Sequence, residues 1–187
     1  DYAGPRDDQG KPAYEKLGLP GYLPQAPITL AELSQKLATA PLVDQPGTVF
    51  RYGYSNDILG RLIEVVSGKP LDQYLEERIF KPLGMKDTGF YAPPEKLSRL
   101  VTLYAPKEGG GIQPTTRPSQ DFFKKKPTLF LGGAGLVSTL DDYSHFCQML
   151  LNEGEYDGVR LLSRKGIELM RVDHIGNMPH ATVLPEW

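Results

Sequence analysis

The sequence predicts a mainly α-helical fold with short β-strands, and three observations point to it. Apolar residues recur at helical spacing in several segments, most clearly from about Asp57 to Ser67. No segment supplies the long apolar strands of a central sheet. The 187 residues include 20 glycines and 17 prolines. This content, about a fifth of the chain, predicts long ordered loops between a few good helices.

The ends of these helices are marked by recognisable capping residues. Thr29 precedes Glu32 by three residues, which is a capping box, and the helix that it opens should end before Pro41. The helix over 57–67 should end at Gly68, because glycine is the usual residue after a helix C-terminus. Further helices are expected over 71–79, from Ser138 or Thr139 to about Asn152, and after Ser163 to about Val172.

The segments between the helices predict short strands and long loops. Residues 1–28 indicate an extended surface region with one helical turn near 13–17, and residues 105–129 a long loop. We predict a single partial domain over 1–187. Short extended segments are expected at 48–52, 87–91 and 101–104, a helical turn or two over 94–100, and a hairpin turn at 155–158.

Composition excludes several classes of partner. The net charge is −2 and the pI is about 6.0, so nothing attracts nucleic acid or an anionic membrane. The basic run 124–126 is typical of a solvated loop, and no apolar run approaches the length of a membrane span. A single cysteine, Cys147, leaves both the bacterial cytoplasm and the periplasm open. The polar start without Met indicates a fragment or a processed chain.

No metal or cofactor is expected. The three histidines, at 145, 174 and 180, lack the spacing of metal ligands. The glycine-rich run 131–136 lacks the lysine of a phosphate-binding loop. Residues 53–57 do not spell the Gly-x-Ser-x-Gly elbow of α/β-hydrolases.

One segment carries a specific resemblance. Residues 50–60, Phe-Arg-Tyr-Gly-Tyr-Ser-Asn-Asp-Ile-Leu-Gly, resemble the second-motif region of class C β-lactamase-related serine hydrolases, a family of esterases, acyltransferases, D-alanyl-peptidases and β-lactamases. The resemblance continues at 78–90, 132–139 and 154–163 and covers most of 29–172. It implies that this chain is an internal fragment, the helical-domain portion of the β-lactamase/transpeptidase-like α+β fold.

Two of the three catalytic elements of this family are missing from the sequence. The family uses a Ser-x-x-Lys, a tyrosine in a following loop, and a Lys-Thr-Gly or His-x-Gly strand. No serine here has lysine three residues later. His174-Ile175-Gly176 matches His-x-Gly by spelling, but it follows a predicted helix rather than a glycine-rich strand. The resemblance therefore implies that the nucleophile lies outside this chain and that the fragment alone is inactive.

Two tyrosines compete for the catalytic role that the resemblance implies. Tyr54 opens a Tyr-Ser-Asn sequence, the lactamase form, but Gly60 follows only six residues later. Tyr52 lies eight residues before Gly60, and Asp57 lies three before it, as in the esterase-like form. We therefore predict Tyr52 as the catalytic tyrosine, with Tyr54 facing the substrate. The alternative is that both tyrosines pack at a helix entry.

A serine hydroxyl needs a base within hydrogen-bond reach, and in this family a lysine and a tyrosine share that role. Gly132 and Gly133 are predicted to allow close backbone approach beside the substrate cleft, although a simple turn into a helix would also explain them.

The expected function is part of a serine hydrolase that forms an acyl-enzyme on small-molecule ester or amide substrates, β-lactams included. The alternative is a non-catalytic helical binding domain on the same scaffold. A homo-oligomer is a further expectation, because a fragment of this fold would expose core surface.

Overall fold

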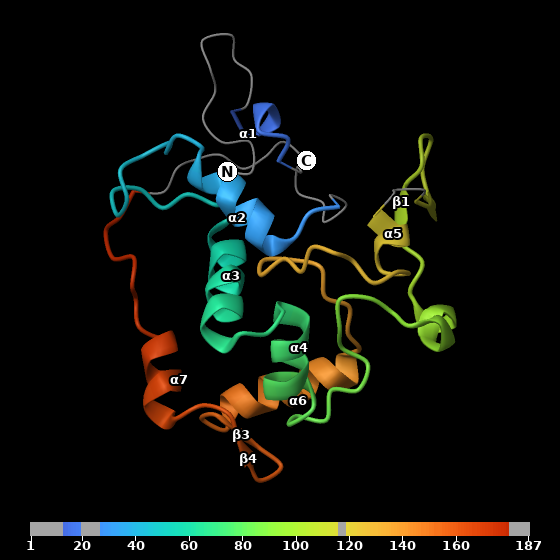
Figure 1. Ribbon diagram of the computed structural model, residues 1–187. Coiled ribbons are helices and arrows are strands. Elements are labelled where there is room, and N and C mark those ends of the chain that lie inside the picture. The colour runs from blue at the N-terminus through green and yellow to red at the C-terminus, as the bar shows by residue number, and fades with distance from the viewer. Residues whose placement is uncertain (1–12, 20–26, 116–118, 180–187) are drawn as a thin grey trace.

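The computed structural model describes residues 13–19, 27–115 and 119–179. These residues form an α-rich region with few strands, as predicted (Figure 1). The strands pair as two antiparallel hairpins: β1 (Tyr104–Pro106) with β2 (Ile112–Pro114), and β3 (Glu155–Tyr156) with β4 (Val159–Arg160). The helices are α1 (Ala13–Lys16), α2 (Leu30–Ala38), α3 (Ser55–Ser67), α4 (Leu71–Leu75), α5 (Ser119–Phe122), α6 (Leu140–Leu151), α7 (Arg164–Met170), the π-helix η1 (Glu76–Phe80) and the 3-10 helix η2 (Pro94–Arg99).

The predicted caps are present at the helix ends. The Glu32 N–H donates to Thr29 Oγ1 at 3.2 Å, and the Thr29 N–H donates to Glu32 Oε2 at 2.7 Å, so the capping box is complete. Helix α3 begins at Ser55, two residues before the predicted start, and ends at Ser67, directly before Gly68, whose φ is +67°. Thr139 caps α6 and Ser163 caps α7. These predictions of helices and their caps are confirmed.

The helix predicted over 71–79 divides into two parts. Its first five residues are α4, and the next five are the π-helix η1, in which the Lys81 N–H donates to the Glu76 carbonyl at 2.9 Å. The wider turn precedes Pro82, which has no amide hydrogen and whose ring crowds the carbonyl of Arg78 four residues earlier.

The predicted strands were mostly wrong. In 87–91 only Gly89 pairs, through an isolated bridge to Val137, and of 101–104 only Tyr104 belongs to a strand. The segment 48–52 forms no strand either, although the Phe50 N–H donates to the Pro179 carbonyl at 2.8 Å. A strand needs a neighbouring strand to satisfy its backbone, and here the partners are single residues from distant loops. The loop predicted over 105–129 contains β2 and α5.

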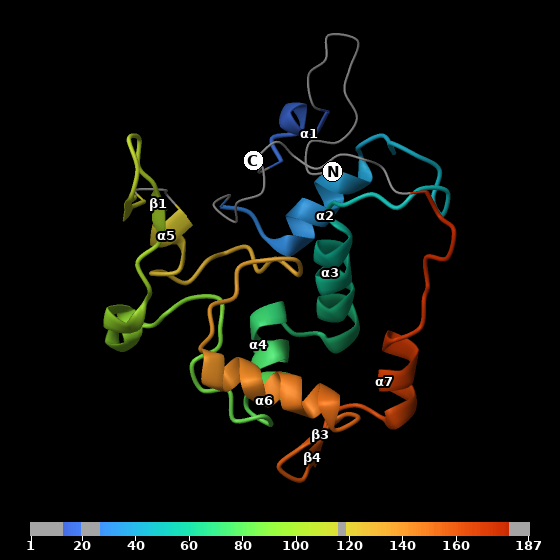
Figure 2. The ribbon, with the colours of Figure 1, turned by 180° about the vertical axis from the view of Figure 1, so that it is seen from behind.

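Two apolar clusters hold these elements together. Figures 1 and 2 show α2, α3, α4 and α6 in succession along the molecule, with α7 to one side of α3. The first cluster joins α2, the start of α3, α4 and the loop before α6, and the second packs η1 and the turn after it against α6. The buried members are Leu19, Leu30, Leu33, Tyr54, Leu71, Phe90, Leu129 and Leu131 in the first cluster, and Phe80, Leu83, Met85 and Met149 in the second.

Helix α3 buries only one of its sides. Asp57 and Gly60 are buried, whereas Leu59, Leu62, Val65 and Val66 are 55% to 79% exposed. A row of large apolar side chains in water marks a surface that contacts another part of a protein. No helix in the described part of the chain is long and apolar enough to cross a membrane.

Candidate functional site

The two candidate tyrosines lie just before and at the N-terminus of α3, with opposite exposure. Tyr52 is 56% exposed, whereas Tyr54, the residue before the first helical position, is 7% exposed. The chain bends at Gly53, between the two tyrosines. Tyr54 belongs to the first core cluster, and its ring centroid lies 5.9 Å from that of Tyr14. Of the two tyrosines, Tyr52 is therefore the one accessible to a group outside this chain.

Burial also changes the chemistry of Tyr54. Desolvation, together with smaller contributions from the negative charges of Asp57 and Tyr14, raises the pKa of Tyr54 to about 12. Its hydroxyl therefore stays protonated at neutral pH, and Tyr54 is poorly suited to act as a general base. That the small exposed part of Tyr54 faces a substrate stays a prediction.

The glycine pair lies directly against the first turn of α3. A Cβ on Gly132 would lie 2.0 Å from the Asn56 carbonyl oxygen, whereas one on Gly133 would lie 3.5 Å from the nearest heavy atom, Asn56 Cβ. Only glycine allows the first of these approaches. The structure thus joins the segment of Gly132 and Gly133 to the helix entry that follows Tyr54.

Asp57 links the first turn of α3 to the segment of Gly132 and Gly133. From the sequence, its position indicated only the spacing of the tyrosine. Its side chain is 1% exposed, and its carboxylate accepts the N–H of Gly133 at 3.2 Å and that of Gly132. An aspartate in the first turn of a helix was a visible signal for a backbone N–H partner. Its partners in a distant loop were not visible in the sequence.

The buried position of Asp57 predicts an unusual pH dependence. Desolvation raises the pKa of Asp57, and the N–H groups of Gly133 and Gly132 only partly oppose that rise. Because the folded-state pKa lies above the ordinary 3.8, the unfolded chain ionises first. The contribution of Asp57 to stability is therefore fully present below the ordinary pKa of 3.8. It is lost as the pH rises through the raised pKa of the folded state.

We expect Asp57→Asn to remove this component. Asn keeps a side-chain oxygen for the Gly133 N–H but does not titrate. Urea unfolding from about pH 4 to about pH 8 should show the variant gaining stability relative to the unmodified chain as pH rises. The exposed Asp141→Asn is the control. Parallel stability curves for Asp57→Asn and the unmodified chain would contradict the expectation.

An apolar cavity adjoins the glycine pair. Its volume is about 460 Å³, and it lies between α3, α4 and the loop 131–136. Its walls include Leu59, Ile63 and Leu75 from the helices and Leu136 from the loop. Within the described residues, no group of three or more His, Cys, Asp or Glu side chains could hold a metal ion. The cavity therefore offers exposed glycine backbone and apolar surface, and neither Tyr52 nor Tyr54 is among the residues that line it.

Comparison with known proteins gives a consistent group of relatives. The family model described as Beta-lactamase matches residues 8–177. Protein Rv1367c of Mycobacterium tuberculosis is 39% identical over 145 residues, which are 74% of this chain and 34% of that protein. Esterase EstB of Burkholderia gladioli is 31% identical over 144 residues, which are 69% of this chain and 36% of that esterase.

A solved structure is similar along most of the chain. That of EstCE1, a hydrolase with promiscuous acyltransferase activity, superposes with a TM-score of 0.69 at 29% identity. The match covers 91% of this chain and 46% of EstCE1. The chain spans about a third of the length of the curated relatives named above.

Proposed function

Because this chain belongs to the beta-lactamase family, we propose that it is the helical part of a serine hydrolase that cleaves ester or amide bonds, β-lactams included, through an acyl-enzyme. In this proposal the chain supplies Tyr52 as the catalytic tyrosine. The serine and its lysine come from a part of the parent enzyme outside these 187 residues.

The observation that carries the proposal is the difference between the two tyrosines. Tyr52 has the spacing of the esterase-like form and is 56% exposed, whereas Tyr54 is buried in a core cluster. A general base must reach the proton that it removes, and this supports Tyr52 rather than Tyr54. The spacing also favours an esterase-like activity over a lactamase-like one.

The proposed chemistry divides acyl transfer into two steps. Tyr52, with the parent's lysine, takes the proton of the serine hydroxyl while the serine oxygen attacks the carbonyl carbon. The leaving group departs with a proton, and water then attacks the acyl-serine ester and releases the acid. Gly132 and Gly133 have no side chains, so a substrate could approach their backbone beside the helix entry that Asp57 holds.

The exposed apolar side of α3 supports the view that this chain is part of a larger fold. Leu59, Leu62 and Val66 would pack against the rest of the parent enzyme. In the isolated chain a second copy would cover them, so we expect a homo-oligomer. Light scattering that gives a clean monomer at all concentrations would count against the oligomer.

Assays of the isolated chain test the inactivity that the proposal requires. We expect no hydrolysis of nitrocefin or of p-nitrophenyl esters above the buffer rate, because no serine here is followed by lysine at the required spacing. Turnover by this chain that Tyr52→Phe abolishes would contradict the claim.

A non-catalytic helical binding domain is the second candidate, and the absence of Ser-x-x-Lys from the sequence favours it. The reading frame upstream of Asp1 separates the two candidates. A Ser-x-x-Lys encoded some tens of residues before Asp1 supports the hydrolase, and its absence supports the binding domain.

A further inference from the structure

The N–H groups of the glycine pair at 132–133 are already engaged inside the protein. The Gly133 N–H donates to Asp57 Oδ1 at 3.2 Å, and the Gly132 N–H also lies against this carboxylate. Asp57 is 1% exposed, so both N–H groups are directed inwards. They are therefore not available as donors to a substrate, in the way that N–H groups stabilise the oxyanion of acyl transfer.

The carbonyl of Gly132 has the opposite direction. The peptide bond between Gly132 and Gly133 is trans, and in a planar trans peptide the C=O points away from the N–H. Because this N–H is directed at Asp57, the Gly132 carbonyl points away from that carboxylate. No described residue donates a hydrogen bond to the carbonyl, so its oxygen keeps its full acceptor capacity.

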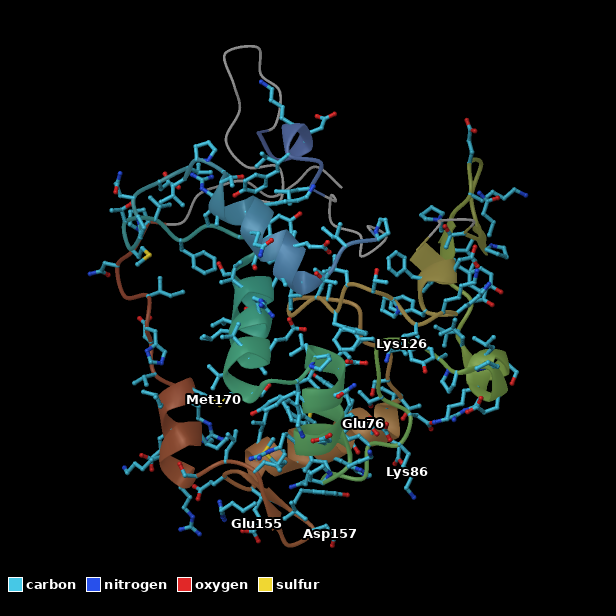
Figure 3. The ribbon with its side chains drawn as sticks, in the orientation of Figure 1. Glu76, Lys86, Lys126, Glu155, Asp157 and Met170 are labelled. Atoms are coloured by element: carbon cyan, nitrogen blue, oxygen red, sulfur yellow. The ribbon has the colours of Figure 1, made fainter. Side chains whose placement is uncertain are left out.

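The glycine pair lies at the surface beside the helix that Tyr52 precedes. Gly132 and Gly133 are both exposed and line the apolar cavity between α3 and α4. The Gly132 Cα would lie 3.4 Å from a Cβ on Gly60, so the loop runs against the first two turns of α3. Figure 3 shows the loop between α5 and α6 at the upper half of α3, whereas the labelled Met170, at the end of α7, lies near the lower end. This end of α7 therefore does not cover the glycine pair.

We propose that the Gly132 carbonyl recognises a hydrogen-bond donor on the acyl part of the substrate, close to the reacting carbonyl. Esters and amides of N-acylated amino acids are the simplest class with such a donor, because their N–H is one carbon away from that carbonyl. A simple aliphatic ester would displace water from the Gly132 oxygen and give no hydrogen bond in return, which disfavours it. The inference rests on the proposed function, in which this loop adjoins the reacting group.

Two esters that differ in one group test the inference in the parent enzyme. The p-nitrophenyl ester of N-acetylglycine carries the N–H, and that of O-acetylglycolic acid has an oxygen in its place. We expect kcat/KM, divided by the rate constant in buffer, to be about 10-fold higher for the ester with the N–H. Equal values would overturn the inference and leave the proposed function standing. Hydrolysis of neither ester above the buffer rate would overturn the proposed function and this inference with it.

Variants of Asp57 connect the preference to the Gly132 carbonyl. Asp57→Ala removes the acceptor that orients the peptide between Gly132 and Gly133, so the preference for the N–H ester should fall several-fold. Asp57→Asn keeps an oxygen for the Gly133 N–H and should keep most of the preference. Asp141→Ala, which removes an exposed carboxylate of α6, should keep all of it.

The preference is a ratio of two kcat/KM values measured on one preparation. It does not depend on the fraction of the enzyme that is folded, so a less stable Asp57→Ala variant still gives a clear result. A merely structural role of Asp57 would lower both kcat/KM values equally. An unchanged preference in Asp57→Ala would therefore overturn the assignment to the Gly132 carbonyl.

Discussion

Replacing Tyr52 by Phe in the parent enzyme is expected to lower kcat/KM for an ester substrate by about 10²- to 10⁴-fold, the usual contribution of a positioned general base. The change removes one hydroxyl from a side chain that is already half exposed. Folding should therefore change little, since surface substitutions usually alter stability by no more than about 0.5 kcal/mol. The measurement is steady-state hydrolysis of p-nitrophenyl esters by the purified parent and its variant.

Tyr54→Phe is the matched control, because it removes the same hydroxyl two residues away. Tyr54 is buried, so this variant should lose stability, by about 1 kcal/mol for the lost hydrogen-bonding group, and keep most of its activity. The reverse result, in which Tyr54→Phe inactivates the enzyme and Tyr52→Phe does not, would move the catalytic role to the lactamase-like tyrosine.

Gly132→Ala is expected to destabilise this chain by about 1–3 kcal/mol or more, because overpacking forces the backbone to move. The new Cβ would lie 2.0 Å from the Asn56 carbonyl oxygen, and neither backbone segment can yield as a flexible side chain would. Moving the loop would also lengthen the hydrogen bond from Gly133 to Asp57. Urea unfolding followed by circular dichroism measures the loss.

The adjacent glycine provides the control for this variant. A Cβ on Gly133 would meet its nearest neighbour at 3.5 Å, an ordinary contact. Gly133→Ala should therefore change the free energy of unfolding by no more than about 0.5 kcal/mol. Equal losses for the two variants would show that the glycine pair is not held against α3 in the way described.

The helices could be predicted because their signals are local. The Thr29 and Glu32 capping box lies within one turn, and Gly68 ends α3 through its own backbone preference. The strand predicted at 87–91 was wrong because pairing depends on a distant partner. Among the described residues, Gly89 pairs only with Val137, and no second strand lies beside this segment.

The roles of the candidate site residues stay predictions. Counting from Tyr52 to Gly60 singled out one tyrosine, and the structure adds that this tyrosine is exposed. The close approach of Gly132 to Asn56 and the buried role of Asp57 join segments that are far apart in sequence, so no local pattern indicated them.

In the proposed function, this chain supplies a catalytic tyrosine to a serine that lies elsewhere in the parent enzyme. Intact-mass analysis after treatment with a fluorophosphonate, which phosphonylates activated serines, tests it most directly. We expect a stoichiometric adduct on the parent enzyme, at a serine outside these 187 residues, and no adduct on the isolated chain. A stoichiometric adduct on any serine of the isolated chain would contradict this assignment of the nucleophile.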